Sequence, residues 1–486
     1  MAPAKKEITL FYLISLLFLA FSAGMILLHA SFVILLIPAA LLLAYFAFFS
    51  LDVFFLVTVA LVPLSVPLQI ITPNLGFDLS LPAEPLMIFI LLLLVMKGLR
   101  EPLFPAALLR HPLTLIIMIY LSWMFVTAVT STMPLVSFKY FLAHLWFIAS
   151  AYFLGFLLFS KTKNIYLFLL VYILPLVLVI LYAFYNQSLA GFINQKAAHS
   201  AMRPFYNDHT AYGAILAMFI PVIAGFLSLP KQSRPVSSTA SFLLLLLFLT
   251  ALLFSYSRAA WISVAGMFVV FILIWFRVRV EIIVTGIGIL IVAFFIFQSS
   301  IWIKLQENRQ ESSTSLAKHL ESVANVRSDA SNMERILRWK CALDMFAEKP
   351  LTGWGPGTYM FQYAPFQRSY DRTIISTNFG DRGNAHSEYL GPLSETGWPG
   401  LLSVFLILVF ALHTGIRTYL RTHDRETGIL SLAITLGLVT YFIHGLLNNF
   451  LDTDKASVPF WGFMAILVAL DLKTRDQREK EQPHTI

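Results

Sequence analysis

Charged residues are scarce in this sequence. They make up 12% of the chain, whereas hydrophobic residues make up 58%. Ordinary water-soluble domains are roughly 25% charged, and such a fold cannot cover this much apolar surface, although a bilayer accepts it. The shortage of charge therefore excludes a water-soluble protein and predicts an all-α polytopic membrane protein.

Other absences narrow the choice further. The single cysteine, Cys341, cannot form an intramolecular disulfide, and we expect it to pack on a helix. The stretch GWGPG at 353–357 is not followed by Lys-Ser or Lys-Thr, so it does not predict a nucleotide-binding loop. Internal repeats, which secondary transporters usually contain, are not evident.

Basic residues exceed acidic ones and give a net charge of +8, but they do not form one patch. They fall in short clusters between apolar runs, so we expect no nucleic-acid partner. With both termini in the cytoplasm, the cytoplasmic segments carry 18 Lys and Arg residues, and the short loops on the other side carry 5. This bias follows the positive-inside rule and favours cytoplasmic termini.

Apolar runs of about 20 residues, long enough to cross about 30 Å of hydrocarbon, recur along the chain. The run at 8–28 follows Lys5 and Lys6 and could be a signal peptide, but no cleavage site is evident and a first span is favoured. Because some early runs are short or poorly separated, we expect a bundle of about 12–14 transmembrane helices. The candidate spans are residues 8–28, 31–49, 53–71, 83–97, 113–131, 138–159, 164–185, 208–228, 240–256, 259–276, 282–300, 398–416, 428–449 and 457–472.

Three regions follow from this pattern. We expect transmembrane helices 1–11 in residues 1–300, one large outward-facing loop at 301–397, and the last three transmembrane helices with a cytoplasmic tail in residues 398–486. Loops of this length are usually functional or disordered. An S-x-x-E capping box that begins at Ser331 precedes apolar residues at helical spacing, which predicts an amphipathic helix near 332–349 within the loop.

An arginine interrupts one long apolar stretch. Residues 242–276 would form a single helix of roughly 52 Å, much longer than the hydrocarbon core, so we expect a turn near Tyr256 to Arg258. An arginine between two spans is costly unless it is paired, and it marks a functional site. The alternative is an interfacial arginine that reaches lipid phosphates.

A second arginine is expected on the same side of the membrane. In RPFYNDHTAYGAILAMFIP, residues 203–221, Asn207 or Asp208 can cap the following span, and capping is the favoured interpretation of both. A cap does not explain Arg203. Two arginines on one face suit a diphosphate, because the planar guanidinium binds phosphate oxygens bidentately.

Reactive groups also precede a late apolar run, in GNAHSEYLGPLSETGWPGLL at 383–402. If residues 385–397 are helical, His386 and Glu388 lie on different faces. A neutral imidazole at the membrane boundary can accept a proton from a substrate hydroxyl, and the alternative is a structural histidine. The D-x-D in FLDTDK at 450–455 is only a weak metal signal, and we expect no metal site.

Four blocks spanning 203–402 carry a family resemblance. In chain order they are RPFYNDHTAYGAILAMFIP, SYSRAAWISV, ERILRWKCALDMFAEKPLTGWGPGTYMFQY and NAHSEYLGPLSETGWPGLL. With this order around one large outer loop, the chain resembles the O-antigen ligase and polysaccharide polymerase superfamily of bacterial inner-membrane glycosyltransferases. The first 130 residues contribute only hydropathy to the likeness.

The resemblance implies a function and its residues. Members transfer glycans from undecaprenyl diphosphate in the periplasm, without a metal, a nucleotide sugar or another cofactor. By this likeness the catalytic loop histidine is His386, and the arginines that hold the lipid diphosphate are Arg258 and Arg203. The supporting candidates are Glu388, Arg382 and Asp452.

We therefore expect a multi-pass inner-membrane glycosyltransferase with a periplasmic loop and membrane lipids around it. His386 would take a proton from an acceptor hydroxyl, and one displacement would invert the anomeric centre. The acceptor, whether lipid A core, growing glycan or protein, stays open, and so does the choice between ligase and polymerase. A secondary transporter is the alternative of another class, with His144 as its clear mid-span ionisable residue.

Overall fold

The structure is a computed structural model. It describes residues 50–71, 79–279, short pieces between 281 and 289, 330–367 and 383–481. The chain divides into two compact units, residues 1–58 and 59–486. Of the first unit the structure describes residues 50–58, in which Thr58 Oγ1 donates a hydrogen bond of 2.9 Å to the Phe54 carbonyl one helical turn earlier. The following paragraphs concern the second unit.

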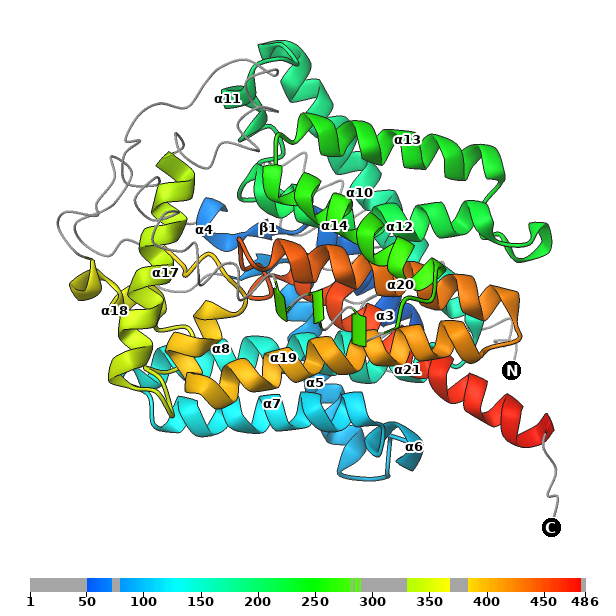
Figure 1. Cartoon of the computed structure of the whole chain (residues 1–486), viewed down its shortest axis with the longest axis horizontal. Helices are drawn as coiled ribbons and strands as arrows, with labels where there is room; N and C mark the ends of the chain where they lie inside the picture. Colours follow the sequence, from blue (N-terminus) through cyan, green and yellow to red (C-terminus); the bar gives the residue numbers. More distant parts are fainter. Residues whose placement is uncertain are drawn as a thin grey trace, which may run out of the picture. The chain divides into compact units, whose positions relative to one another are not determined.

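Helices form nearly all of the described second unit (Figure 1). A small two-stranded antiparallel sheet pairs β1 (Val66–Pro67) with β2 (Ser80–Leu81). The α-helices are α3 (Leu51–Leu61), which begins in the first unit, α4 (Leu68–Ile71), α5 (Ala83–Gly98), α6 (Ala106–Leu109), α7 (Pro112–Val129), α8 (Pro134–Phe147), α9 (Gly155–Leu158), α10 (Thr162–Ala190), α11 (Gln195–Ala198), α12 (His209–Ser228), α13 (Ser238–Phe254), α14 (Arg258–Trp275), α17 (Ala330–Glu348), α18 (Tyr359–Gln362), α19 (Leu390–Arg421), α20 (Arg425–His444) and α21 (Asp454–Glu481). Shorter turns are η2 (Val62–Leu64), the π-helix η3 (Ile148–Leu154), η4 (Lys231–Ser233) and η5 (Ala364–Phe366).

The described residues confirm an all-α polytopic membrane protein. Eight of their helices are long and apolar enough to cross a membrane: Pro112–Val129, Pro134–Leu158, Thr162–Ala190, His209–Ser228, Arg258–Trp275, Leu390–Arg421, Arg425–His444 and Asp454–Lys480. Shorter apolar helices cover Leu51–Leu64 and Ser238–Phe254. The predicted spans at 8–28 and 31–49, and most of 282–300, lie outside the described residues.

One predicted span is wrong in extent. The run at 53–71 is not one helix, because α3 ends at Leu61 and the chain continues through η2 into strand β1. Pro63 explains the break, since a proline in the helix interior has no N–H to donate to the preceding turn.

The last helices form the centre of the bundle. Helix α20 packs against α12, α14 and α19, and α19 also packs against α7 and α21. Within its apolar window α21 is 94% buried, whereas α14 is 28% buried, so α21 is central and α14 borders the outside. Helix α17 lies across one end of the bundle, and the C-terminus lies at the other end (Figure 1).

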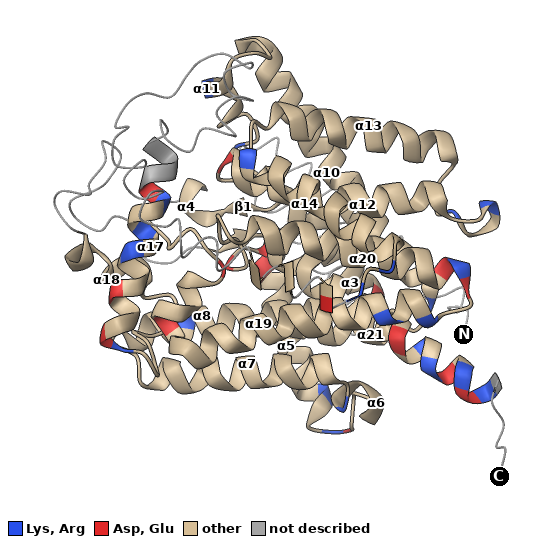
Figure 2. Ribbon diagram, viewed as in Figure 1, with Lys and Arg blue, Asp and Glu red and all other residues tan. Residues whose placement is uncertain are grey.

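Charged residues collect at the two ends of this bundle, as a membrane protein requires (Figure 2). At the end near the C-terminus, Asp471 of α21 accepts a hydrogen bond of 2.5 Å from Arg417 and forms an ion pair of 2.7 Å with Arg475. The ring of His111, which precedes α7, lies 3.3 Å from the same carboxylate. The network therefore joins α7, α19 and α21.

A glycine kink in α19 receives the loop that follows α17. Gly397 has a φ of 72°, which separates the first turns of α19 from the rest. The backbone of the GWGPG turn docks there, because Gly355 N–H donates to the Glu395 carbonyl at 2.8 Å and Trp398 N–H donates to the Pro350 carbonyl at 3.0 Å. Trp123 of α7 donates to the Thr396 carbonyl at 2.8 Å, which satisfies a backbone group that the kink releases.

We predict that Gly397→Ala destabilises the protein. A Cβ at Gly397 would lie 2.2 Å from the Leu351 carbonyl oxygen, and a positive φ is itself costly for alanine. The expected loss in free energy of unfolding is about 2 kcal/mol or more, measurable as a lower melting temperature in detergent. Gly191→Ala is the control, since Gly191 also has a positive φ of 88° but no neighbour within 4 Å of the added Cβ. Equal melting temperatures for the two variants would contradict the steric part of the explanation.

Candidate active site

His386 lies in an irregular turn just before α19. Its φ is 50°, in the left-handed region that non-glycine residues seldom adopt, and α19 begins only at Leu390. The condition that residues 385–397 are helical therefore does not hold for residues 385–389. The turn is held by the His386 N–H, which donates to Asn384 Oδ1 at 3.1 Å, and by the Trp339 ring, which donates to the His386 carbonyl at 3.4 Å. A strained residue fixed in this way is typical of a functional position.

Charged groups from two distant elements act on the His386 ring. Those with the largest effect are Arg335, Arg338 and Glu334 of α17, and Asp208 at the start of α12. Arg338 pairs with Glu334 at 2.9 Å. Burial, followed by the positive charges of Arg335 and Arg338, lowers the pKa of His386 to about 4. The imidazole is therefore neutral near pH 7 and can accept a proton.

Arg258 and Arg335 approach each other at this end of the bundle. Arg258 begins α14, directly after the turn through Tyr256 that the length of the apolar stretch predicted. Arg335 donates through Nε to the Leu447 carbonyl at 3.1 Å, and its positive charge acts on Arg258. Burial lowers the pKa of Arg335. Two guanidiniums brought together repel each other, and an anion between them relieves the repulsion.

Arg335 was not among the sequence candidates. A signal was present, because Arg335 and Arg338 lie three residues apart on the predicted amphipathic helix and therefore on neighbouring parts of one face. The sequence does not reveal which face turns toward Arg258, since that depends on how α17 packs across the bundle.

Asp208 caps α12 and supplies a negative charge at the site, in addition to that of Glu334. Its Oδ1 accepts hydrogen bonds from the backbone of Thr210 at 2.7 Å and of Ala211 at 2.9 Å, so the predicted cap is confirmed. Burial alone would raise the pKa of Asp208, but these bonds and the Thr210 hydroxyl outweigh burial and lower it. The carboxylate stays ionised and acts on both Arg335 and His386.

The other described candidates have different surroundings. Arg203 is exposed and donates through Nε to the Asn207 carbonyl at 2.9 Å, and it is not among the groups with the largest effect on His386. Arg382 lies outside the described residues. Asp452 is exposed, and its charge acts on Glu388. His144, the transporter candidate, is buried in α8 with its ring 4.4 Å from that of Tyr140.

Glu388 anchors the loop between α20 and α21. Its Oε1 accepts from the Tyr441 hydroxyl at 2.6 Å and from the backbone of Phe450 at 2.7 Å and Leu451 at 3.0 Å. Its own N–H donates to the Gly445 carbonyl at 2.8 Å. Burial raises the pKa of Glu388 to about 7 despite these donors. Glu388 is therefore a positioning residue for residues 445–453.

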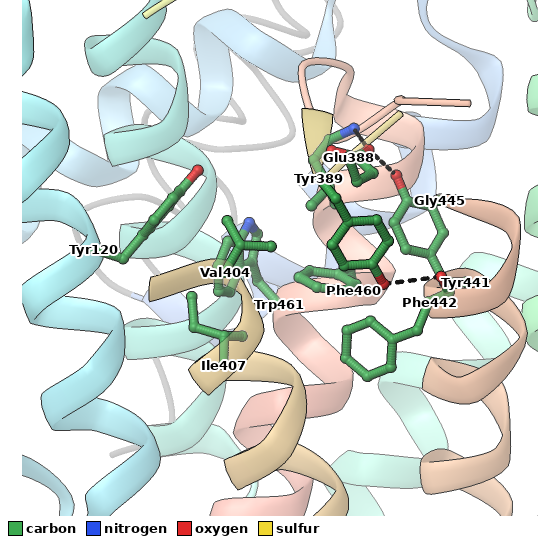
Figure 3. A pocket seen from close by; sticks show the side chains of 11 residues that line it. Tyr120, Glu388, Tyr389, Val404, Ile407, Tyr441, Phe442, Gly445, Phe460 and Trp461 are labelled. Carbon is green, nitrogen blue, oxygen red and sulfur yellow. Dashed lines mark hydrogen bonds between the residues drawn. The ribbon is translucent and has the colours of Figure 1, made fainter. Parts of the chain in front are cut away.

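An aromatic pocket lies beside Glu388, between α7, α19, α20 and α21 (Figure 3). Apart from Glu388 its lining is mainly apolar, and Tyr389 closes one wall by donating to the Phe442 carbonyl at 2.9 Å. The lining residues are Tyr120, Glu388, Tyr389, Val404, Ile407, Tyr441, Phe442, Gly445, Leu451, Phe460 and Trp461.

We predict that Glu388→Ala loosens residues 445–453. The change leaves the Tyr441 hydroxyl and two backbone amides without their acceptor, and each such loss costs about 1–3 kcal/mol. Hydrogen exchange at the Phe450 and Leu451 amides should become about 10-fold faster or more. Glu388→Gln is the matched variant, because its amide oxygen can still accept. Unchanged exchange in Glu388→Ala would refute the anchoring role.

The two carboxylates of the D-x-D at 450–455 have different surroundings. Asp454 is buried, with Oδ1 3.2 Å from Lys455 Nζ, and it also pairs with Ser65. Asp452 is exposed. Among the residues that the structure describes, no group of three or more His, Cys, Asp or Glu is arranged to hold a metal ion.

Comparison with known proteins gives a match over part of the chain. A family model described as O-antigen ligase matches residues 242–406, a segment that contains Arg258, Arg335, Glu388 and His386. A search of curated proteins finds no match to the chain. The family model covers residues 242–406 of the 486-residue chain, and together with the eight apolar helices it supports an integral membrane protein similar to O-antigen ligases.

Proposed function

We propose that the protein moves a glycan from undecaprenyl diphosphate to an acceptor sugar hydroxyl at the periplasmic face of the bacterial inner membrane. One feature supports the proposal above all: the charge of Arg335 acts both on the neutral His386 and on Arg258, which belongs to a separate element. A weak base beside two cations suits a reaction in which a hydroxyl is deprotonated and a diphosphate leaves.

In the proposed reaction, His386 takes the proton of the acceptor hydroxyl. The acceptor oxygen then forms a bond to the anomeric carbon, and the bond from that carbon to the diphosphate oxygen breaks. The electron pair stays on the leaving lipid diphosphate, whose charge Arg258 and Arg335 stabilise. A single displacement of this kind inverts the anomeric centre, and it draws on no metal.

In this scheme the bound diphosphate also changes the pKa of His386. Burial, followed by the positive charges of Arg335 and Arg338, holds the pKa of His386 low in the free protein. Bound diphosphate neutralises part of that positive charge and so raises the pKa of His386 toward its ordinary value near 6.5. His386 would therefore be a stronger base when the donor is in place than in the free protein. Arg203 remains a candidate for an outer contact with the same donor.

The decisive test is transfer by the purified protein in detergent or nanodiscs. The substrates are undecaprenyl-diphosphate glycan with lipid A core, or with a second glycan, each with and without a chelator. We expect glycan transfer that the chelator does not reduce. No transfer to any acceptor, or facilitated glycan flux without transfer, would refute the proposal, and the second outcome would favour the transporter.

Ligase and polymerase differ only in the acceptor. Deletion of the gene separates them, because loss of long glycan chains identifies a polymerase, whereas long chains left on the lipid carrier identify a ligase. We favour the ligase and expect long chains on the carrier.

A further inference from the structure

A second histidine lies deep in the same end of the bundle. His444 is the last residue of α20, and its side chain is 1% exposed. The charged groups that act on it are Arg335 and Asp208, which also act on His386. Arg335 is tied to the loop that follows His444 by its 3.1 Å hydrogen bond to the Leu447 carbonyl. His444 therefore belongs to the site, although the mechanism above does not use it.

Buried polar atoms without partners cluster around His444. In the described part of the chain, no group forms a hydrogen bond with either ring nitrogen of His444, with Asn448 Nδ2 or with Asn449 Oδ1. Asn448 is 3% exposed. Native interiors rarely leave such groups unpaired, because their desolvation is then uncompensated. Four such atoms within six residues point to a ligand rather than to a packing accident.

The backbone amides of this loop form hydrogen bonds, in contrast to the side chains of His444, Asn448 and Asn449. The Leu447 and Asn448 amides donate to the His444 carbonyl at 3.0 and 3.2 Å, and the Gly445 amide donates to the Tyr441 carbonyl at 2.7 Å. Glu388 accepts from the amides of Phe450 and Leu451. The loop is thus fixed in shape, and it presents polar side chains at defined positions.

The unpaired atoms include both donors and acceptors. A neutral imidazole offers one of each, Asn448 Nδ2 is a donor, and Asn449 Oδ1 is an acceptor. The oxygens of a diphosphate diester can only accept, so they cannot pair with Asn449 Oδ1 or with the unprotonated imidazole nitrogen. Sugar hydroxyls both donate and accept. The Phe450 ring, 5.7 Å from the His444 ring, adds an apolar surface for the C–H face of a sugar.

We propose that His444, Asn448 and Asn449 form a binding subsite for the sugar bonded directly to the diphosphate of the donor. The inference rests on the proposed function. A diphosphate held at Arg335 brings its first sugar next to the loop at 445–449, to which Arg335 itself is hydrogen bonded. The subsite would thus bind the donor sugar, while His386 would take the proton from the acceptor hydroxyl.

The test compares two probes, undecaprenyl diphosphate alone and undecaprenyl diphosphate that carries one sugar, bound to the full-length protein in nanodiscs. We expect the wild type to bind the sugar-bearing lipid more tightly. His444→Phe and Asn448→Ala should each reduce this preference about 5- to 10-fold and leave the affinity for the bare lipid unchanged. Arg335→Ala should weaken both probes together. His423→Ala is the matched control, since His423 is exposed in the turn between α19 and α20.

Stability and kinetics complete the test. His444→Phe removes unpaired buried atoms, so its melting temperature should be no lower than that of the wild type. If His444 had a purely structural role, its replacement would lower the melting temperature. In transfer assays of His444→Phe and Asn448→Ala, the KM for the donor should be higher than in the wild type, and the KM for the acceptor should be unchanged. An unchanged preference in both variants would show that the atoms bind only water, and a rise confined to the acceptor KM would overturn the donor assignment. Because the binding assay needs no turnover, it can fail independently of the proposed transferase activity.

Discussion

His386→Ala is expected to reduce glycan transfer by about 100-fold or more, because a positioned general base contributes about 10²–10⁴ in rate. The reason lies in the geometry: the ring is neutral near pH 7, and its turn is fixed by Asn384 and Trp339. The measurement is the initial rate of transfer by purified protein with saturating undecaprenyl-diphosphate glycan and acceptor.

The control for this prediction is His423→Ala, which removes an exposed histidine at the opposite end of the bundle and should transfer normally. Both variants should insert and purify as the wild type does. A His386→Ala protein that folds and retains near-normal transfer would remove the histidine from the mechanism.

The pH dependence gives an independent test of the same residue. His386 acts only when unprotonated, so activity should fall as the pH drops through its pKa. In the free protein that pKa is about 4, so the acid limb of kcat/KM should lie near pH 4. Bound diphosphate raises the pKa, so the acid limb of kcat should lie at higher pH. If the acid limbs of kcat and kcat/KM lie at the same pH, the diphosphate does not bind beside the arginines that act on His386.

Arg335→Ala is expected to lower transfer by about 100- to 1,000-fold, the usual cost of removing one electrostatic contact to a developing charge. Arg335 is half-buried, its charge acts on Arg258, and it donates a hydrogen bond to the Leu447 carbonyl. Arg335→Lys keeps the charge but loses the planar fork, so we expect only partial activity. The loss should appear in kcat as well as in KM, because the charge on the diphosphate grows in the transition state.

Arg425→Ala is the matched control, since Arg425 is an exposed arginine at the other end of α20. Arg258→Ala should resemble Arg335→Ala. The double variant should lose less than the product of the two single effects, because the two guanidiniums act on one group. Full additivity, or normal transfer by Arg335→Ala, would contradict a shared diphosphate.

Length and local chemistry were enough to predict several features of the chain. The turn before Arg258 follows from a stretch too long for one span, and Asp208 caps α12 as its position before an apolar run predicts. Pro350 ends the amphipathic helix of the loop, which closes at Glu348. Each of these depends on residues close together in the chain. The early run at 53–71 was misjudged because hydropathy alone does not register the break at Pro63.

The site required distant contacts. The sequence alone determined that the protein spans a membrane, that Arg258 lies at a turn between spans, and that a histidine precedes α19, because hydrophobicity, helix length and capping are local properties. Only the tertiary structure showed that the charges of Arg335 and Asp208 act on His386, that Glu388 holds the loop after α20, and that the same two charges act on His444. These outcomes depend on which face of α17 rests on the bundle, and packing between elements hundreds of residues apart sets that orientation.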